Sequence, residues 1–318
     1  MIDFVGNKRW FFLISAIAIL VAIVSLAAFK LQPGIDFSGG TAITINFTPQ
    51  VEQSESPQLQ SQLRQEITKF GHPEAIIQFQ KESSSFFVRT KFMSPEEVNE
   101  LRDRLKTVLQ REVETSVPLE MSPTIAAETA RNAGLAVIIA VVAMLFYIAW
   151  AFRRMPKPFR WSTCAIIALI HDVLIVVGIF SILGKTANVE VDAMFITGLL
   201  TVVGYSINNT VVVFDRMREN MSKGISHDFA VIVNSSLLET LGRSLNTSLT
   251  TLCVILALFL FGGATIHNFV LVLLVGLIAG TYSSIFIAGP LLVVWEKKEW
   301  GQLFSWLPSF KKPAQLEH

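Results

Sequence analysis

The sequence predicts an α-helical membrane protein with six transmembrane helices and one extracytoplasmic ferredoxin-like α+β domain of order βαββαβ. Composition is the first observation: 52% of the 318 residues are hydrophobic and 16% are charged, whereas soluble domains average about 25% charged residues. The second observation is a set of six apolar runs, each near the roughly 20 residues that cross a bilayer as a helix. The third is a mixed strand and helix pattern over 31–122, between the first two runs.

The six predicted spans are Trp10–Phe29, Ala133–Phe152, Ser162–Leu183, Asp192–Phe214, Leu245–Phe261 and Asn268–Trp295. The first run is too long for the apolar region of a signal peptide, and no small-residue cleavage pattern follows it before Pro33. We therefore expect an uncleaved first span.

Orientation follows from the basic residues beside the spans, which favour the cytoplasmic side. They precede the first span, separate the second from the third and the fourth from the fifth, and follow the sixth: Lys8, Arg9, Arg153, Arg154, Lys157, Arg160, Arg216, Arg218, Lys223, Arg243, Lys297 and Lys298. The opposite loops, 184–191 and 262–267, contain no lysine or arginine other than Lys185. This predicts cytoplasmic termini, a first span within 1–30, an outer domain over 31–122 and a five-helix bundle over 123–296.

The last predicted segment is a cytoplasmic tail over 297–318. Its final residues, Leu316, Glu317 and His318, resemble the start of a vector-encoded tag.

The outer domain is predicted from alternating strand patterns and two amphipathic helical patterns. Ser94 is an N-cap followed by proline and two glutamates, which is typical of a helix start. The other helix begins near Pro57. The predicted strands are 41–47, 75–80, 86–91 and 112–119, and the order βαββαβ is that of a ferredoxin-like split unit.

Apolar residues recur at helical spacing over 226–241, between the fourth and fifth spans. They predict an amphipathic helix at the cytoplasmic membrane surface. A short soluble helix packed on the loops is the alternative.

The fourth span carries an unusual polar face. Thr201, Tyr205 and Asn208 fall at i, i+4 and i+7, and Asn209 follows Tyr205 by four residues. Asparagine and threonine often form hydrogen bonds between membrane helices. Two adjacent asparagines with a tyrosine one turn away exceed that need, which favours a functional site.

His171 and Asp172 lie near the middle of the third span. A carboxylate at that depth must be neutral, paired or facing water, and a proton or ion relay is one hypothesis. The other is a structural hydrogen bond from a permanently protonated Asp172.

Arg243 opens the fifth span, with Thr247 and Thr251 following at four-residue steps. The guanidinium is always charged and could reach inward as part of a polar lining. Alternatively, it could extend toward the headgroups as an anchor. In the sixth span, the small residues Gly276, Gly280, Ser283 and Ser284 indicate only close helix packing.

Several classes of function are disfavoured. The net charge of +1 argues against a nucleic-acid binder, and Cys164 and Cys253 both lie in apolar runs that suit neither a disulfide nor a metal site. No nucleotide loop, zinc spacing or nucleophile elbow occurs. We therefore expect no enzymatic activity, no cofactor and no metal.

Two long motifs carry a family resemblance. Gly34-Ile-Asp-Phe-Ser-Gly-Gly-Thr41 follows the first span, and Val203-Gly-Tyr-Ser-Ile-Asn-Asn-Thr-Val-Val-Val-Phe-Asp-Arg-Met-Arg-Glu-Asn220 ends the fourth. With the segment around Arg243, they resemble the SecF family, the smaller subunits of the bacterial SecDF protein-export complex, related to resistance-nodulation-division exporters. The matching motif residues include Asp36, Gly39, Gly40, Asp215 and Arg216.

The resemblance implies a multi-pass protein of the cytoplasmic (inner) membrane that pairs with SecD. It implies work with the SecYEG channel and SecA to move preproteins outward, using the proton motive force. It also implies that position 209 carries the family's proton-handling carboxylate and that Arg243 is its partner. We expect Tyr205, Asn208 and Thr247 to line this site and Asp172 to be a second candidate carrier.

Position 209 departs from the family pattern because it is Asn209 rather than aspartate. An amide resembles a protonated carboxylic acid in shape but exchanges no proton in this pH range. Either the substitution was introduced to fix one protonation state, or protons are relayed elsewhere, through Asp172 or a carboxylate of SecD. A scaffold subunit that conducts nothing is the rival function, and a small-molecule exporter half is a weaker one.

Overall fold

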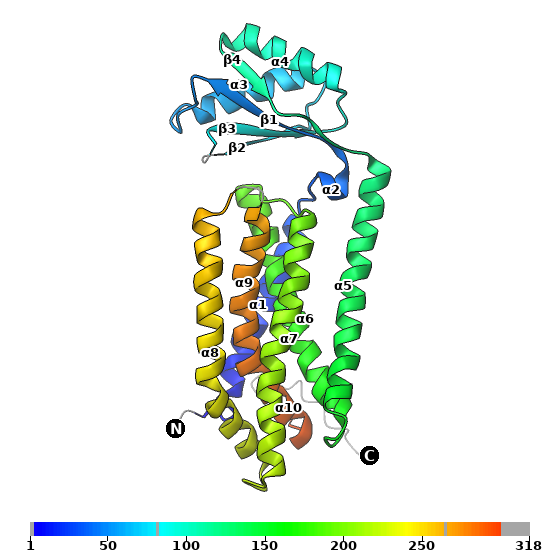
Figure 1. The fold of residues 1–318 in the computed structure, drawn as a ribbon, viewed down its shortest axis with the longest axis vertical. Coiled ribbons are helices and arrows are strands. Elements are labelled where there is room, and N and C mark those ends of the chain that lie inside the picture. Colours follow the sequence, from blue (N-terminus) through cyan, green and yellow to red (C-terminus); the bar gives the residue numbers. More distant parts are fainter. Residues whose placement is uncertain (1–2, 81–82, 264–265, 300–318) are drawn as a thin grey trace, which may run out of the picture.

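The computed structural model describes residues 3–80, 83–263 and 266–299 of the chain. A bundle of long helices carries a small sheet domain at one end, and the start of the chain lies at the other end (Figure 1). Lys8 Nζ, at the start of the first helix, lies 2.6 Å from Glu299 Oε2, just beyond the last. Both ends of the described chain therefore lie on the side opposite the sheet domain. From residue 300 onward, the predicted cytoplasmic tail, including the tag-resembling residues 316–318, lies outside the described residues.

The prediction of six helices able to span a membrane is confirmed within the described ranges. Each extends beyond its apolar run because polar residues at the ends continue the helix. The spans are α1 (Lys8–Phe29), α5 (Pro123–Ala151), α6 (Pro158–Ala187), α7 (Ala193–Ser222), α8 (Phe229–Phe261) and a sixth, His267–Lys297, made of α9 (His267–Ser283), the π-helix η2 (Ser284–Ala288) and α10 (Gly289–Lys297).

The predicted boundary between a surface helix over 226–241 and the fifth span is absent. Both belong to the single helix α8, which begins after the N-cap Asp228 and continues through Gly242. A lone glycine costs only about 1 kcal/mol in a helix, and α8 packs along α7, so tertiary contacts offset this cost. Ile232, Val233 and Leu237 of the amphipathic pattern are buried.

The interior of the bundle is formed by α6, α7 and the sixth span, which are about half buried, whereas α1, α5 and α8 are mostly exposed. Small residues allow α7 and α9 to approach closely. A Cβ on Gly276 would lie 2.2 Å from Val202 Cγ2, and one on Gly280 would lie 3.1 Å from Ser206 Cβ. The predicted close packing at these glycines is confirmed.

The sheet domain contains one antiparallel sheet in the order β2-β3-β1-β4. Helices α3 and α4 cover one face, and their apolar residues join those of the strands in one core (Figure 1). The elements are α2 (Ile35–Ser38), β1 (Gly40–Thr48), α3 (Ser56–Lys69), β2 (Ile76–Gln80), β3 (Ser85–Thr90), α4 (Pro95–Leu109), β4 (Glu112–Thr115) and β5 (Leu119–Met121). Ser94 caps α4 in a capping box with Glu97, as its sequence predicts.

The strand predicted over 112–119 is divided into β4 and β5, which both pair with β1. Pro118 has no N–H to donate to the ladder. Between the two strands, the backbone N–H of Ser116 donates to the Thr44 carbonyl (2.8 Å), and the Ser116 hydroxyl accepts from the Thr44 N–H (2.9 Å). The serine thus completes the hydrogen bonds of β1 where the partner strand breaks.

Acidification is expected to weaken the sheet domain through Glu66. Its carboxylate lies 2.6 Å from Lys69 Nζ and 3.1 Å from Arg104 Nε. The hydrogen bond from Lys69 lowers the pKa of Glu66, burial opposes this, and the bond from Arg104 lowers the pKa further. The stabilisation is therefore present above the ordinary value of 4.5 and is lost as pH falls through the lower folded value.

We expect Glu66→Gln to cost about 1 kcal/mol at pH 7, since both cations are partly screened by solvent, and to remove part of the acid sensitivity. Amide hydrogen exchange of β1 in the full chain measures both effects. Glu100→Gln, an exposed change on α4, is the control. Equal acid sensitivity in both variants would contradict the assignment.

Candidate functional site

A buried carboxylate lies at the centre of the bundle. Asp172 of α6 is 0% exposed and accepts hydrogen bonds from Ser206 of α7 (2.6 Å) and Ser283 of α9 (2.7 Å). Its other oxygen lies 2.9 Å from His171 Nδ1. We call these four residues the carboxylate cluster. The carboxylate cluster joins the three innermost helices, α6, α7 and α9.

His171 extends the carboxylate cluster toward α1. The imidazole is 3% exposed and stacks with Tyr282 at a centroid distance of 6.1 Å. Tyr282 in turn donates its hydroxyl to the Phe11 carbonyl of α1 (2.9 Å). His171 Nε2 is buried without a hydrogen-bond partner among the described residues. One ring nitrogen thus faces the carboxylate, and the other is free to bind a water molecule or pass a proton.

The prediction that Ser283 only packs helices is wrong. Its hydroxyl bonds to Asp172, and Ser206 was not singled out from the sequence at all. A serine within an apolar helix carries little signal, because its direction depends on how neighbouring helices rotate. The π-helix just after Ser283 has a local cause in Pro290, which lacks an N–H and crowds the carbonyl four residues earlier.

A second group of hydroxyls lies between α7, α8 and α9. The Ser248 hydroxyl accepts from Tyr205 (3.3 Å) and from Thr281 (2.8 Å). We call these three residues the hydroxyl cluster. Nearer the end of the bundle away from the sheet domain, Asn220 of α7 donates to Ser236 of α8 (3.0 Å). The Tyr205–Ser248 and Asn220–Ser236 contacts fix the antiparallel register of α7 against α8.

This register places Asn209 opposite Ser244, one helical turn beyond Tyr205 and Ser248. Each is 3% exposed, and Asn209 Nδ2 and Ser244 Oγ are both buried without a partner among the described residues. Buried polar groups without partners are rare and costly. Position 209 therefore holds a buried side chain whose amide nitrogen makes no hydrogen bond with a described residue.

The other predicted site residues on α7 and α8 are less buried than Asn209. Asn208, Arg243 and Thr247 are exposed, while Tyr205 is half-buried. The guanidinium of Arg243 makes no ion pair with any described residue, and the Thr247 hydroxyl donates to the Arg243 carbonyl (2.9 Å). The structure therefore brings Arg243 and Asn209 to the same level of α7 and α8 without joining them. Polar groups exposed along membrane-spanning helices are costly against lipid.

The motif residues at the far end of α7 form surface ion pairs. Asp215 pairs with Arg218, and Arg216 pairs with Glu219 and with Glu239 of α8. Of these pairs, the one between Arg216 and Glu239 joins α7 to α8.

The glycine motif lies where the sheet domain meets the bundle. Gly39 and Gly40 have φ of +71° and +121°, and a Cβ on Gly40 would lie 2.2 Å from the Thr90 carbonyl oxygen. No other residue fits this turn into β1. Asp36 of α2 accepts a hydrogen bond from the Ala193 N–H at the start of α7 (2.8 Å).

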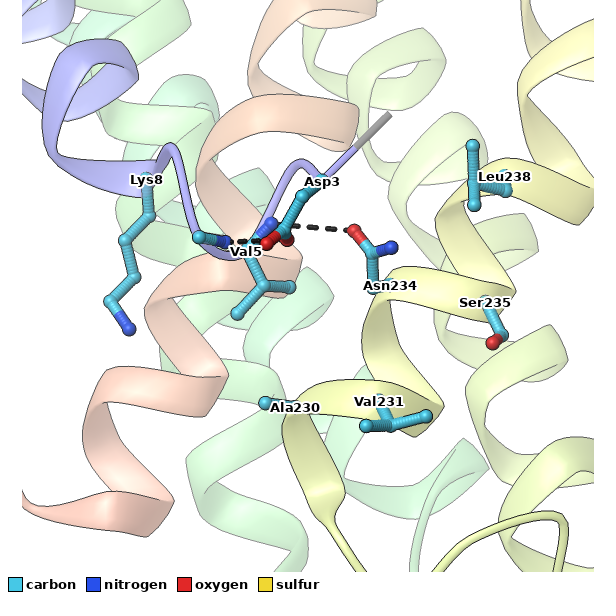
Figure 2. A pocket seen from close by; sticks show the side chains of 9 residues that line it. Asp3, Val5, Lys8, Ala230, Val231, Asn234, Ser235 and Leu238 are labelled. Atoms are coloured by element: carbon cyan, nitrogen blue, oxygen red, sulfur yellow. Dashed lines mark hydrogen bonds between the residues drawn. The ribbon is translucent and has the colours of Figure 1, made fainter. Parts of the chain in front are cut away.

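A cavity of about 420 Å³ lies at the opposite end, between the N-terminal segment and the start of α8 (Figure 2). Asn234 closes it by accepting from the backbone N–H groups of Phe4 (2.8 Å) and Val5 (3.4 Å). Asp3, Lys8 and Ser235 add polar groups to an otherwise apolar wall. This cavity anchors the N-terminal segment and shares no residue with either polar cluster. Across the described ranges, no group of acidic, histidine and cysteine side chains could hold a metal ion.

Comparison with known proteins decides the family. Residues 101–298 match the model described as "Protein export membrane protein SecD/SecF, C-terminal", and residues 24–51 match "SecD/SecF GG Motif". The protein translocase subunit SecF of Thermobaculum terrenum is 43% identical, over 96% of this chain and 97% of the relative. The chain belongs to the SecF family. The resemblance carried by the two long sequence motifs is thereby confirmed.

Other SecF-family relatives extend the comparison. SecF of Anaerolinea thermophila is 40% identical over 99% of both chains. The SecDF protein of Bacillus subtilis is 34% identical over 93% of this chain but 38% of its own length. The crystal structure of SecDF from Thermus thermophilus superposes with a TM-score of 0.80 at 35% identity, over 93% of this chain and 39% of that one. The chain thus corresponds to less than half of the single-chain SecDF proteins.

Proposed function

We propose that this chain is the SecF subunit of a SecDF complex that uses the proton motive force to promote preprotein translocation across the bacterial cytoplasmic membrane. The carboxylate cluster is the observation that carries this proposal. Asp172 is fully buried at the centre of the bundle and bonded to side chains of three helices. Ionisable residues at such depth are expensive and typically mark ion or proton pathways.

The proposed topology has both termini in the cytoplasm and the sheet domain outside the inner membrane. Two features support it: basic residues flank the spans on one side, and the described chain ends lie opposite the sheet domain (Figure 1). The antiparallel order β2-β3-β1-β4 with two helices supports a ferredoxin-like domain. This outer domain would contact the preprotein or the partner subunit.

The proposed membrane partner is SecD, and SecYEG and SecA are the proposed translocation machinery. The exposed polar face of α7 and α8, formed by Asn208, Arg243 and Thr247, supports a protein partner in the membrane. Lipid tails cannot solvate these groups, whereas another polar helix can. In this proposal Arg243 pairs with a carboxylate of SecD, and Asn209, Asn208, Tyr205 and Thr247 line the route.

A non-conducting scaffold that stabilises the translocon is the second candidate. The amide at Asn209 favours it, since this side chain cannot exchange protons at ordinary pH.

Replacing Arg243 with alanine separates the two functions. In proteoliposomes that contain the SecD-bound complex, a pH gradient should drive a proton flux that falls about tenfold or more in Arg243→Ala. A pH-sensitive dye inside the vesicles measures the flux. Arg154→Ala is the matched control, because it also removes an exposed cytoplasmic-side arginine. If Arg243→Ala and Asp172→Asn leave flux and export intact while deletion of 36–120 stops export, the scaffold function holds instead.

A further inference from the structure

The loop between α6 and α7, residues 188–192, is held by backbone hydrogen bonds to the segment that leaves α1. The Val191 N–H donates to the Gln32 carbonyl (2.8 Å), and the Gly34 N–H donates to the Val191 carbonyl (2.7 Å). A Cβ on Gly34 would lie 3.2 Å from that carbonyl oxygen. The two segments thus form a short parallel bridge at the outer end of the bundle.

Side chains of the sheet domain reach the same loop. Arg89 of β3 lies 3.0 Å from Glu190 Oε2 and also donates to the Pro33 carbonyl. Gln78 of β2 donates to the Asn188 carbonyl (2.6 Å). The neighbouring strands β2 and β3 therefore both bind the loop directly. Arg89 binds the loop and also the segment that leaves α1. We call this assembly of 31–39 and 188–192 with Arg89 the joint.

The joint also caps α7. Asp192 accepts from the Phe195 N–H (2.7 Å), and Asp36 accepts from the Ala193 N–H (2.8 Å). The first N–H groups of a helix have no partner within the helix, and carboxylates there also interact favourably with its dipole. One of these two caps comes from α2, which is distant in sequence and lies between the sheet domain and the bundle (Figure 1).

Arg89 supplies the positive charge that faces Glu190 in the joint. The carboxylates of Asp36 and Asp192 act on Glu190 here, and Arg89 is the cation that opposes their effect on it. Burial raises the pKa of Glu190, Arg89 counteracts this, and the two aspartates raise it further. Both side chains of the pair are nearly buried, with exposed fractions of 11% for Arg89 and 12% for Glu190. Removing Arg89 would leave Glu190 buried beside like charges.

We propose that Asp36 and Arg89 are positioning residues that fix α7 relative to the sheet domain, so that movement of either is transmitted to the other. This inference rests on the proposed function, because α7 is the helix that carries Tyr205, Ser206 and Asn209. It assigns a physical role to the glycine motif: Gly39 and Gly40 make the turn into β1, directly after Asp36 has reached the first residue of α7.

Thiol alkylation tests this role without requiring transport. The reporter is Thr201→Cys, an exposed position on α7, in a full chain with Cys164→Ser and Cys253→Ser, bound to its SecD-type partner in membranes. Arg89→Gln and Asp36→Asn are each expected to change the alkylation rate by about tenfold. Arg89→Lys should restore most of the original rate, since it keeps the ion pair. Arg102→Gln, which removes an exposed pair on α4, should leave the rate unchanged.

Amide exchange of β1 separates positioning from folding. The proposal requires that β1 stays protected in Arg89→Gln and Asp36→Asn while the α7 reporter changes, and that the double variant changes it by less than the product of the two single effects. Alkylation rates within twofold of the parent in both variants would overturn it, as would rates that change only when β1 loses protection. An unmodified complex that moves no protons would refute the proposed function and leave this measurement valid.

Discussion

Asp172→Asn is expected to abolish proton transfer through the bundle while the protein stays folded. The amide keeps the shape of the carboxyl and can still accept hydrogen bonds from Ser206 and Ser283, which lie 2.6 and 2.7 Å away. It has no proton to exchange in this pH range. Flux in proteoliposomes that contain the SecD-bound complex should therefore fall to the level of protein-free vesicles.

Asp172→Ala is expected to lose stability as well as flux. It leaves the Ser206 and Ser283 hydroxyls without their buried acceptor, and an unsatisfied buried group costs about 1–3 kcal/mol. The Asn and Ala variants thus distinguish the two roles that the sequence left open for Asp172, a proton relay and a structural hydrogen bond. Thermal unfolding in detergent measures stability, and Asp103→Asn, an exposed acid on α4, is the control. Normal flux in a folded Asp172→Asn protein would restrict the carboxylate to a structural hydrogen bond.

The spans were predictable because lipid imposes one requirement, an apolar run of sufficient length. Their ends were not. The polar stretch before residue 133 resembles a soluble segment, yet α5 begins at Pro123 behind the capping residue Ser122. The prediction of a separate surface helix over 226–241 was wrong for the same reason, because its polar residues continue without a break into the helix α8. Hydropathy reports the lipid boundary, whereas caps and packing decide where a helix ends.

Within the site, the sequence identified Asp172 but not the partners that hold it. Burial and charge can be inferred from a carboxylate in an apolar run, whereas Ser206 and Ser283 become informative only when three helices are assembled. The two asparagines show the same limit. Successive residues of a helix point about 100° apart, so Asn208 is exposed while Asn209 is buried. Which of the two lies inside depends on the rotation of α7.

The joint could not be found from sequence at all. Asp36 and Ala193 are separated by 157 positions, and no local pattern links them. The glycine motif signalled only a backbone turn with positive φ. Its contact with α7 follows from the way the sheet domain returns onto the bundle.

Asn209→Asp is expected to increase the proton flux of the complex strongly. Position 209 lies in the interface of α7 and α8, where Asn209 Nδ2 and Ser244 Oγ lack partners among the described residues. A carboxylic acid is nearly the same size as the amide and would occupy the same buried position. It would also add a titratable group on the helix that Ser206 links to Asp172. Asn208→Asp, its exposed neighbour, is the matched control, because it adds the same charge outside the interface.

Proton uptake by proteoliposomes that contain the SecD-bound complex, compared between the parent chain and Asn209→Asp under one imposed pH gradient, tests the central claim most directly. We expect a flux about tenfold or more above that of the parent, removed again by Arg243→Ala and accompanied by faster preprotein export. A flux and an export rate that both stay at the parent level in a folded Asn209→Asp complex would contradict the claim that this interface carries protons.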